Sequence, residues 1–234
     1  MTQTKKKSDA NSDAQISMSG ELLRKVIHIS SLSIPIAYYF LPRSTTVIGV
    51  VGLTLLALLI DYGKFYIKPI DRFYHWAFDP ILREHERDMS RKLLSGGSYV
   101  LISACICVLV FPKIIAITAF SILIISDTAS ALIGRRFGKN HFLDKSFEGT
   151  IAFIVSAWIV VLIAPKNGSN LLEYIPGIFA AVVGGIIEAM SVRLRVDDNF
   201  SVPVSIGLTM WLGYFLLAAV IPSTFGPIYE GLLK

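Results

Sequence analysis

Residues 121–150 read SILIISDTASALIGRRFGKNHFLDKSFEGT, and this stretch decides which folds the rest of the chain can adopt. It begins as an apolar helical segment with a carboxylate, Asp127, inside it. It then becomes polar through glycine and basic residues at 134–139 and ends in the run KSFEGT at 145–150. An ionisable residue within a membrane-spanning segment normally faces the protein interior or water and serves a function. The stretch therefore indicates a metal and phosphate site at the surface of a bilayer.

The composition of the whole chain indicates a membrane protein with one domain. The chain has 234 residues, of which 53% are hydrophobic, and its mean hydropathy of +0.62 is too high for an ordinary soluble domain. Residues 1–19 are polar, so we expect a disordered tail there and a single transmembrane domain at 20–234. The lysines at 5–7 are most simply a topology signal, and we expect no nucleic-acid partner. Cys105 and Cys107 lie in an apolar run, which favours buried packing over a metal or redox role.

Apolar runs recur along the chain at 26–41, 45–60, 97–111, 114–133, 151–164, 174–192 and 204–221. Each run predicts a helix, which gives an all-α polytopic membrane protein with about seven transmembrane helices. Several runs are shorter than the roughly 20 residues that a spanning helix needs, so those helices must extend into their flanks or be shielded by neighbours. Pro35 lies inside the first run, where it predicts a kink.

Basic residues fall almost entirely in alternate connections between these runs. With this helix count, 18 of the 22 Lys and Arg residues lie on one side, and the other side keeps only Arg43, Lys113, Lys166 and Lys234. Because cytoplasmic loops are enriched in Lys and Arg, we expect the N-terminus and the candidate site to face the cytoplasm. The longest loop on that side, about 61–96, alternates aromatic and charged residues over 64–78. This is typical of an amphipathic helix lying in the membrane interface, although a solvated connector is an alternative.

Asp127 shares one helix face with Ser130, Ala131 and Gly134, because these residues follow it at i+3, i+4 and i+7. The face is small and polar, with room for a ligand. A carboxylate near the centre of a spanning helix costs roughly 2.5–3.5 kcal/mol on insertion scales, so it is expected to serve a function. The alternative is an acid that only packs its helix against a neighbour.

Further acids are expected at the same level. Glu188 lies near the cytoplasmic end of the sixth run, on a face of small residues that permits close helix approach. The following loop contains Asp197-Asp198-Asn199, and the predicted topology brings it to the same side of the membrane. Carboxylate and amide oxygens are suitable ligands for Mg²⁺, which usually takes one or two carboxylates together with substrate phosphates. A plain loop turn is the alternative for 197–199.

The glycine and basic residues between 134 and 146 are of the kind that cradle a polyphosphate. They offer backbone N–H groups, four cations and the hydroxyl of Ser146. No strand precedes them, so this is not a Walker A sequence. The spacing Gly134-x-x-x-Gly138 is also found in helix packing, but the charged residues around it argue against burial in lipid.

A second cationic group opens the first helix. Arg24 and His28 are four residues apart and share a face, with Lys25 beside them. Such a group either contacts phosphate or anchors the helix by snorkelling to the interface, and the sequence leaves both open.

Four separated motifs, in this order, resemble those of the CTP-dependent lipid-alcohol kinases, which include dolichol kinase, phytol kinase and the CTP-using diacylglycerol kinase. The family is distantly similar to phosphatidate cytidylyltransferases. The motifs are Glu21-Leu-Leu-Arg24-Lys25-x-x-His28, Ser126-Asp127-x-x-Ser130-Ala131-x-x-Gly134-Arg135-x-x-Gly138-Lys139, Lys145-Ser146-x-Glu148-Gly149-Thr150, and Glu188 followed by Asp198-Asn199-x-x-x-Pro203. The resemblance covers nearly the whole chain after the tail. The chain is short for a dolichol kinase and looks more like the compact members.

The resemblance implies a kinase that transfers the γ-phosphate of CTP to the hydroxyl of a membrane lipid alcohol and releases CDP. It implies catalytic roles for Asp127, Lys145 and Glu188, and Mg²⁺ at Asp127, Glu188 and Asp198. The residues that it places on the nucleotide and its phosphates are Arg24, Lys25, His28, Gly134, Arg135, Gly138, Lys139, Ser146, Glu148, Gly149, Thr150 and Asn199. We expect the tail of the alcohol to lie between the fourth and sixth helices.

Two other activities remain open at this point. A cytidylyltransferase acting on a lipid phosphate would use a similar metal and CTP site but would release pyrophosphate. A small ion-coupled or proton-coupled carrier would use Asp127 and Glu188 as relay acids, although the chain shows no inverted repeat of the kind that carriers often have. The sequence names neither the alcohol, whether polyprenol, phytol or diacylglycerol, nor the oligomeric state.

Overall fold

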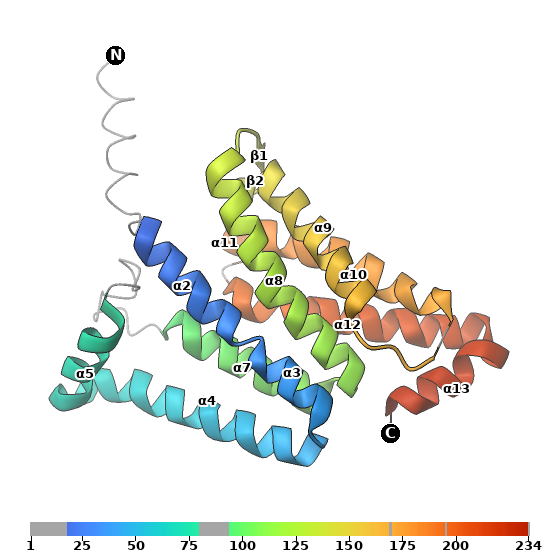
Figure 1. The fold of residues 1–234 in the computed structure, drawn as a ribbon, viewed down its shortest axis with the longest axis horizontal. Coiled ribbons are helices and arrows are strands. Elements are labelled where there is room, and N and C mark those ends of the chain that lie inside the picture. Colours follow the sequence, from blue (N-terminus) through green and yellow to red (C-terminus); the bar gives the residue numbers. More distant parts are fainter. Residues whose placement is uncertain (1–17, 80–93, 169, 195, 234) are drawn as a thin grey trace.

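The computed structural model describes residues 18–79, 94–168, 170–194 and 196–233, and it is built almost entirely of helices (Figure 1). The elements are α2 (Met18–Ser30), α3 (Ser33–Phe40), α4 (Arg43–Tyr66), α5 (Lys68–Phe78), α7 (Gly96–Val110), α8 (Lys113–Phe137), β1 (His141–Phe142), β2 (Lys145–Ser146), α9 (Phe147–Ile163), η3 (Leu171–Glu173), α10 (Tyr174–Ala189), α11 (Ser191–Leu194), α12 (Asp198–Val220) and α13 (Pro222–Leu233). The two short strands form an antiparallel hairpin between α8 and α9.

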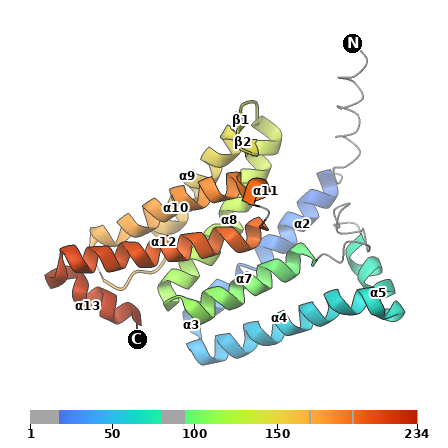
Figure 2. The same cartoon turned by 180° about the vertical axis from the view of Figure 1, so that it is seen from behind.

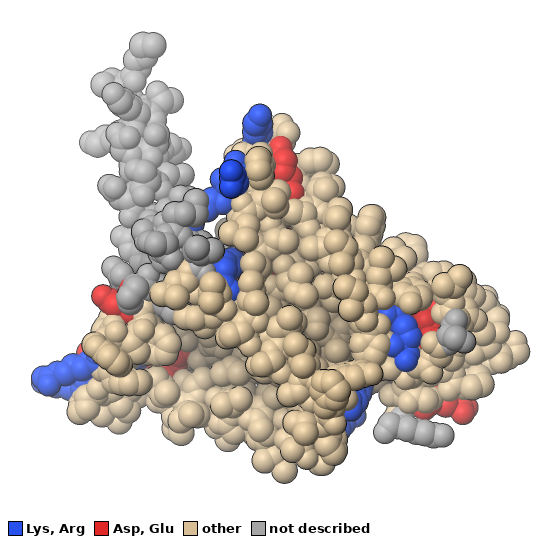
Figure 3. Space-filling view, viewed as in Figure 1, with Lys and Arg blue, Asp and Glu red and all other residues tan. Residues whose placement is uncertain are grey.

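Four helical segments of the described chain are long and apolar enough to cross a membrane. They are α4, α8, η3 with α10, and α12. The apolar helices α7 and α9 have only 15 and 17 residues. The predicted helical membrane protein is therefore confirmed, while the number of spans and the cytoplasmic N-terminus stay predictions. On the face seen in Figure 3, a broad uncharged band separates the charged side chains at its edges, as expected for a protein in a bilayer.

The first predicted helix is broken into two. Helix α2 ends at Ser30 and α3 begins at Ser33, and the backbone N–H groups of Ser31 and Leu32 turn back to the carbonyls of His28 and Ile29. Pro35 explains the break, because it has no N–H to donate to the carbonyl of Ser31 and its ring crowds that carbonyl. The predicted kink is therefore confirmed, and it is sharp enough to divide the run at 26–41 into two helices.

The end of α4 and the connection after it also differ from the expectation. Helix α4 continues to Tyr66, so residues 61–66 are helical rather than part of the predicted loop. Helix α5 follows at 68–78 and confirms a helix in the predicted amphipathic segment, with Tyr74 buried and Trp76 exposed. Its position in a membrane interface stays a prediction. The charged run at 83–88 lies outside the described residues.

Helix α8 forms the centre of the bundle. Within the apolar 18-residue stretch of α8, 72% is buried inside the protein. The corresponding stretch of α4, which lies at the edge of the bundle, is only 22% buried. Helix α9 packs along it, and α2, α3, α7 and α12 contact its other sides (Figures 1 and 2). Ile115, Ile122, Leu123 and Ile124 are fully buried. The central position of α8 places Asp127 among protein groups rather than lipid.

Alternate helices run in opposite directions, so their connections gather at two ends of the bundle. At one end, Arg43 donates to the carbonyl of Leu109 (2.6 Å), and Lys113 donates to the carbonyl of Leu41 (3.0 Å). These contacts tie the α3–α4 corner to the α7–α8 corner. The opposite end holds the β1–β2 hairpin, the C-termini of α8 and α10 and the N-terminus of α12, and there the candidate site lies.

Helix α13 has no counterpart in the sequence analysis, which ended the last helix at 221. It folds back beside α12 and buries Phe225. Asn167 in the α9–α10 connection donates to the carbonyl of Ile228 in α13 (3.3 Å). Helix α13 therefore packs at the end of the bundle opposite the candidate site.

Candidate functional site

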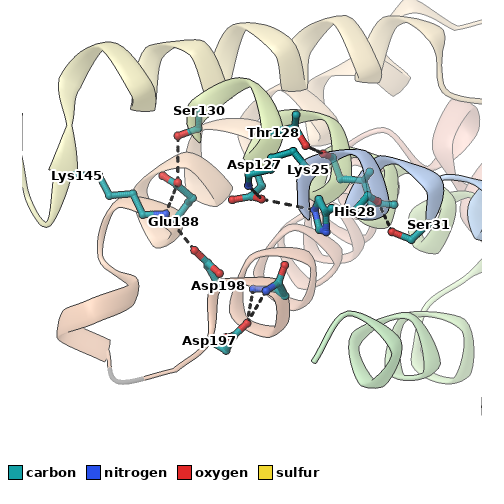
Figure 4. A network of polar contacts seen from close by, with 12 residues as sticks. Lys25, His28, Ser31, Asp127, Thr128, Ser130, Lys145, Glu188, Asp197 and Asp198 are labelled. Atoms are coloured by element: carbon teal, nitrogen blue, oxygen red, sulfur yellow. Dashed lines mark hydrogen bonds and ion pairs between the residues drawn. The ribbon is translucent and has the colours of Figure 1, made fainter. Parts of the chain in front are cut away.

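Three carboxylates from three separate helices lie together at the hairpin end of the bundle (Figure 4). Asp127 comes from α8, Glu188 from the end of α10, and Asp198 from the first position of α12; one oxygen of each lies within 4.8 Å of the others. We call these three residues the acidic cluster. Glu188 is 1% exposed and Asp127 is 9% exposed, so the cluster is inside the protein. The topology predicted from the sequence placed these three acids on the same side of the membrane, and the structure brings them together. The chemical roles of the three acids stay predictions.

The chain around each acid explains its position. Asp127 lies within the α8 helix, on the face that turns towards α2 and α10. Glu188 lies one residue before the end of α10, and the single turn of α11 then leads to α12. Asp197 caps α12, because its carboxylate accepts the backbone N–H of Asn199 (3.0 Å). This cap sets the first turn of α12 and so holds Asp198 beside Glu188.

Two lysines neutralise most of the negative charge. The Lys25 ammonium lies 2.6 Å from Asp127 Oδ2, and Lys25 is 6% exposed. The Lys145 ammonium, from β2, contacts Glu188 Oε1 and lies 3.1 Å from Asp198 Oδ2. Burial alone would lower the pKa of Lys145, but the neighbouring carboxylates outweigh burial and raise its pKa above the ordinary value. Lys145 is therefore a cation in this setting, and the snorkelling alternative is wrong for Lys25, which faces inward.

The acidic cluster keeps acceptor capacity that the described residues do not fill. Three carboxylates face two ammonium groups, and Glu188 Oε2 is buried without a hydrogen-bond partner in the described chain. Ser130 donates to the other oxygen, Glu188 Oε1 (3.1 Å). A buried acceptor left unpaired costs roughly 1–3 kcal/mol, so a ligand that uses it is favoured. The donor set fits Mg²⁺, which takes carboxylate oxygens and few protein ligands.

The glycines of the basic segment serve close packing. Helix α8 extends to Phe137, so Gly134 and Arg135 are helical and do not belong to a loop as predicted. A Cβ on Gly134 would lie 2.9 Å from Ser146 Oγ, and one on Gly138 would lie 2.8 Å from Ser146 Cβ. A Cβ on Gly149 would likewise lie 3.1 Å from the carbonyl oxygen of Ser130. The packing explanation, set aside for Gly134-x-x-x-Gly138, is therefore correct; contacts of these glycines with phosphate stay a prediction.

The run KSFEGT builds the start of α9. Ser146 caps the helix by accepting the backbone N–H of Gly149 (3.1 Å), and the Thr150 hydroxyl donates to the carbonyl of Ser146 (3.2 Å). The Glu148 carboxylate accepts the backbone N–H groups of Lys139 (3.1 Å) and Asn140, which folds the chain after α8 onto α9. Of this run, Lys145 is the residue whose side chain contacts the acidic cluster within the described structure. Arg135 and Lys139 are exposed beside the hairpin.

His28 and Asn199 connect the acidic cluster to a cavity of about 360 Å³. His28 Nε2 lies 3.6 Å from Asp127 Oδ2, and Asn199 directly follows Asp198. Both residues line the cavity together with Arg24, which shares the His28 face of α2 as predicted. The three residues therefore lie near the cluster, although their contact with a nucleotide stays a prediction.

A second buried charge group was missed by the sequence analysis. Lys64 lies 2.9 Å from Asp61 Oδ1, and Ser95 donates both its backbone N–H and its hydroxyl to Asp61 Oδ2 (2.8 Å each). The Lys64 ammonium also lies 4.1 Å from the centre of the Tyr74 ring. We call Asp61, Lys64 and Ser95 the Asp61 group. An acid at the end of an apolar run with a lysine three residues later was the signal available in the sequence.

The fold and the site together define a polytopic helical membrane protein with a buried, lysine-paired acidic cluster at one end of its bundle. The chain belongs to the same family as an uncharacterized protein of Rickettsia prowazekii: the two are 31% identical over 198 residues, which cover 84% of this chain and 96% of that protein. No protein-family model matches the sequence. No solved structure gives a significant match.

More distant homologues carry the names of lipid kinases. The CTP-dependent diacylglycerol kinase 1 of Schizosaccharomyces pombe is 26% identical, over 65% of this chain and 73% of its own length. The dolichol kinase of Saccharomyces cerevisiae is 25% identical over 80% of this chain, which is 36% of that longer protein. A probable phytol kinase of Glycine max is 28% identical over 56% of this chain and 49% of its own length. These names support the resemblance at the level of a lipid-alcohol kinase family.

Proposed function

We propose that the protein is a CTP-dependent kinase that transfers the γ-phosphate of CTP to the hydroxyl of a membrane lipid alcohol, giving the lipid monophosphate and CDP. The observation that carries this proposal is the acidic cluster, with three carboxylate oxygens within 4.8 Å of one another, the buried Lys25 on one side and the partly exposed Lys145 on the other. Phosphoryl transfer depends on positioning and on neutralising charge rather than on covalent chemistry by the protein. A membrane protein with paired acids and lysines at one end supplies these two requirements.

Asp127, Glu188 and Asp198 would hold Mg²⁺. The ion, when bound, would supply positive charge to the phosphate oxygens and so stabilise the charge of the transferring group. Lys25 and Lys145 are held by the same carboxylates in the described structure. Because a lysine ammonium sits on a flexible stem and acts as a point charge, Lys145 can turn from its carboxylates to a phosphate oxygen while Lys25 stays on Asp127. Arg135 and Lys139 would contact the outer phosphates from the hairpin side.

The transfer itself forms one bond and breaks one. The lipid oxygen bonds to the γ-phosphorus, and the bond from that phosphorus to the bridging oxygen breaks, so that CDP leaves with the electron pair. The hydroxyl proton passes to the carboxylate of Asp127, which is the candidate base of the acidic cluster. Lys25, 2.6 Å from Asp127 Oδ2, orients that carboxylate.

The experiment is an assay of the purified protein in vesicles that contain geranylgeraniol, a polyprenol or diacylglycerol, with parallel vesicles that contain phosphatidate as a lipid-phosphate acceptor. CTP, ATP and GTP, each labelled in the γ-phosphate, are supplied with Mg²⁺, and lipid phosphate and free nucleotide are measured. We expect labelled lipid phosphate and CDP in equal amounts from CTP. Pyrophosphate in place of CDP would assign the cytidylyltransferase reaction, and ion flux without nucleotide would assign a carrier; either result overturns the proposal.

Variants locate the activity. Asp127→Asn and Lys145→Ala are expected to lose transfer. Glu173→Gln is the matched control, because Glu173 is also a buried acid (1% exposed) but lies at the other end of α10, where its carboxylate accepts the backbone N–H of Asn167 (3.0 Å). Normal turnover of both test variants would place the reaction elsewhere in the protein.

A further inference from the structure

We propose that the cavity between α2, α4 and α7 receives the lipid alcohol, with the hydroxyl end towards His28 and the apolar chain leaving between α2 and α4. We call this space the acceptor cavity. The inference rests on the proposed function, because it names where that reaction takes its acceptor. It also replaces the expected position of the lipid tail between the fourth and sixth helices, which are α8 to α10, and it moves Arg24, His28 and Asn199 from the nucleotide to the acceptor.

The acceptor cavity has a polar end next to the acidic cluster and a mixed, largely apolar lining elsewhere. Its volume is about 360 Å³. Arg24, His28 and Asn199 line it at the level of the acidic cluster, and the start of α7 at 95–98 adds small and hydroxyl residues. The apolar lining comes from Ile27, Ala57, Ile60, Val100 and Leu101, and the polar Ser30, Ser31 and Asp61 lie among them. Ligand cavities with a few polar groups at one end orient an amphiphilic molecule, and a hydroxyl on an apolar chain has this polarity.

The polar end offers donors that have no partner in the described structure. The His28 side chain is 9% exposed, and its Nε2 makes no hydrogen bond there. Arg24 Nη1 is buried and also lacks a hydrogen-bond partner within the described residues. Buried polar groups of this kind are normally satisfied. A hydroxyl placed between them and the acidic cluster, whose Asp127 Oδ2 is 3.6 Å from His28 Nε2, would satisfy them.

The proposed exit for the apolar chain lies between α2 and α4, which both contribute residues to the cavity lining. The two helices diverge from the corner that joins α3 to α4, and α7 lies behind them (Figures 1 and 2). Val26 and Ile29 on α2 and Leu56 and Leu59 on α4 are exposed, so both helices present apolar side chains outward. An apolar chain can therefore leave between two surfaces that lipid already covers.

A nucleotide triphosphate fits this space poorly. Among the lining residues Arg24 is the sole lysine or arginine, and the acid Asp61 also lines the cavity. Lys145 and the exposed cations of the hairpin lie on the other flank of the acidic cluster. The cluster therefore separates a cation-rich flank, suited to phosphates, from an apolar flank, suited to the acceptor.

Another cavity, of about 410 Å³, lies between α3, α8 and α9, but it faces away from the site. Its α8 lining includes Ser121 and Ile125. At about 100° per residue, these positions lie roughly 120–160° around the helix from Asp127. A hydroxyl bound there would not face the acidic cluster, whereas the acceptor cavity shares His28 and Asn199 with the surroundings of the cluster.

The test fills the acceptor cavity and measures lipid and nucleotide separately. Ala57→Trp on α4 adds bulk inside the cavity, and Ile27→Trp on half-exposed α2 is a second variant that folding tolerates more easily. Gly52→Trp is the matched control, because a Cβ on Gly52 would meet nothing within 4 Å. We expect the KM for geranylgeraniol or diacylglycerol to rise at least tenfold in both cavity variants, with the KM for CTP unchanged, and no change in the control.

A binding measurement separates failure of this inference from failure of the proposed function. A diazirine-bearing geranylgeraniol is photocrosslinked to the protein in vesicles without nucleotide, and the labelled peptides are identified. Labelling of α2, α4 and α7 that falls at least tenfold in Ala57→Trp and Ile27→Trp supports the acceptor cavity. Labelling along α3, α8 and α9, or labelling unchanged in both variants, overturns it. Absence of phosphate transfer in every protein, the control included, would instead overturn the proposed function.

Discussion

The acidic cluster and the Asp61 group are both buried sets of charges, but only one of them is complete. In the Asp61 group one carboxylate faces one ammonium, and both oxygens of Asp61 accept hydrogen bonds, from Lys64 and from Ser95. In the acidic cluster three carboxylates face two ammonium groups, and Glu188 Oε2 is unpaired in the described chain. A satisfied network rigidifies a fold, whereas an unsatisfied one is costly unless a ligand completes it. The comparison therefore favours a structural role for the Asp61 group and supports the functional role proposed for the acidic cluster.

The largest expected effect is on activity. Glu188→Gln removes one carboxylate and leaves two acids facing Lys25 and Lys145, so the charges balance and the protein should stay folded. Removal of one preorganised oxyanion-hole donor typically costs about 10²–10³ in rate, and we expect loss of a carboxylate from the acidic cluster to lower phosphate transfer by about the same factor. Turnover and thermal unfolding in detergent are measured on the same samples. If Glu188→Gln loses as much stability as Asp61→Asn, which is described next, or if it keeps full turnover, the distinction between the acidic cluster and the Asp61 group is wrong.

The next effect is on stability. Asp61→Asn leaves the Lys64 ammonium buried without its counter-ion, and breaking a buried ion pair in this way costs roughly 3–5 kcal/mol. We expect a lower free energy of unfolding and earlier proteolysis near α5, which Lys64 contacts through Tyr74.

The double variant Asp61→Asn/Lys64→Met serves as the control for this prediction. It removes both charges, so most of the lost stability should return, since replacing a whole buried pair by apolar groups is often neutral. If the double variant is as unstable as the single one, the ion pair is not the cause of the loss.

A smaller effect concerns Mg²⁺ binding without any turnover. A ligand that binds only the folded state stabilises it by about 2.7 kcal/mol at 100 times its dissociation constant. We expect Mg²⁺ with a non-hydrolysable CTP analogue to raise the unfolding temperature of the wild type and of Asp61→Asn by similar amounts. Glu188→Gln and Asp198→Asn should lose most of this shift. Equal shifts in all four proteins would show that the ion binds outside the acidic cluster.

The sequence predicted the helical elements and the side of the bundle on which the acids gather. Each apolar run corresponds to helix in the structure, and alternation of the helices alone brings the ends of α8 and α10 and the start of α12 together. The phase of Asp127 and Ser130 on α8 was readable because residues three apart share a helix face. Ser130 indeed donates to Glu188.

Other features depend on distant partners and could not be read from local patterns. Lys25 reaches Asp127 across 102 positions, and Asp61 reaches Ser95 across 34. The same lysine would snorkel if α2 were rotated, and only packing against α8 decides between the two. The glycines at 134 and 138 suit both a phosphate site and close packing; the sequence does not specify the position of Ser146, which shows that both glycines are packed closely, while their contact with phosphate stays a prediction.

The smallest expected effect concerns Ser146, and it separates a role in capping α9 from a role in binding the nucleotide. Ser146 caps α9, next to Lys145, and loss of an N-cap costs about 1 kcal/mol. Ser146→Ala should lower the unfolding temperature slightly, while Ser146→Asp, which keeps a cap acceptor, should restore it. If Ser146 also contacts phosphate, the KM for CTP will rise in Ser146→Ala and rise further in Ser146→Asp, because an added negative charge repels the nucleotide. If Ser146 only caps α9, the KM for CTP will be the same in both variants as in the wild type. Lys145 is then the one residue of the run at 145–150 that connects it to the acidic cluster.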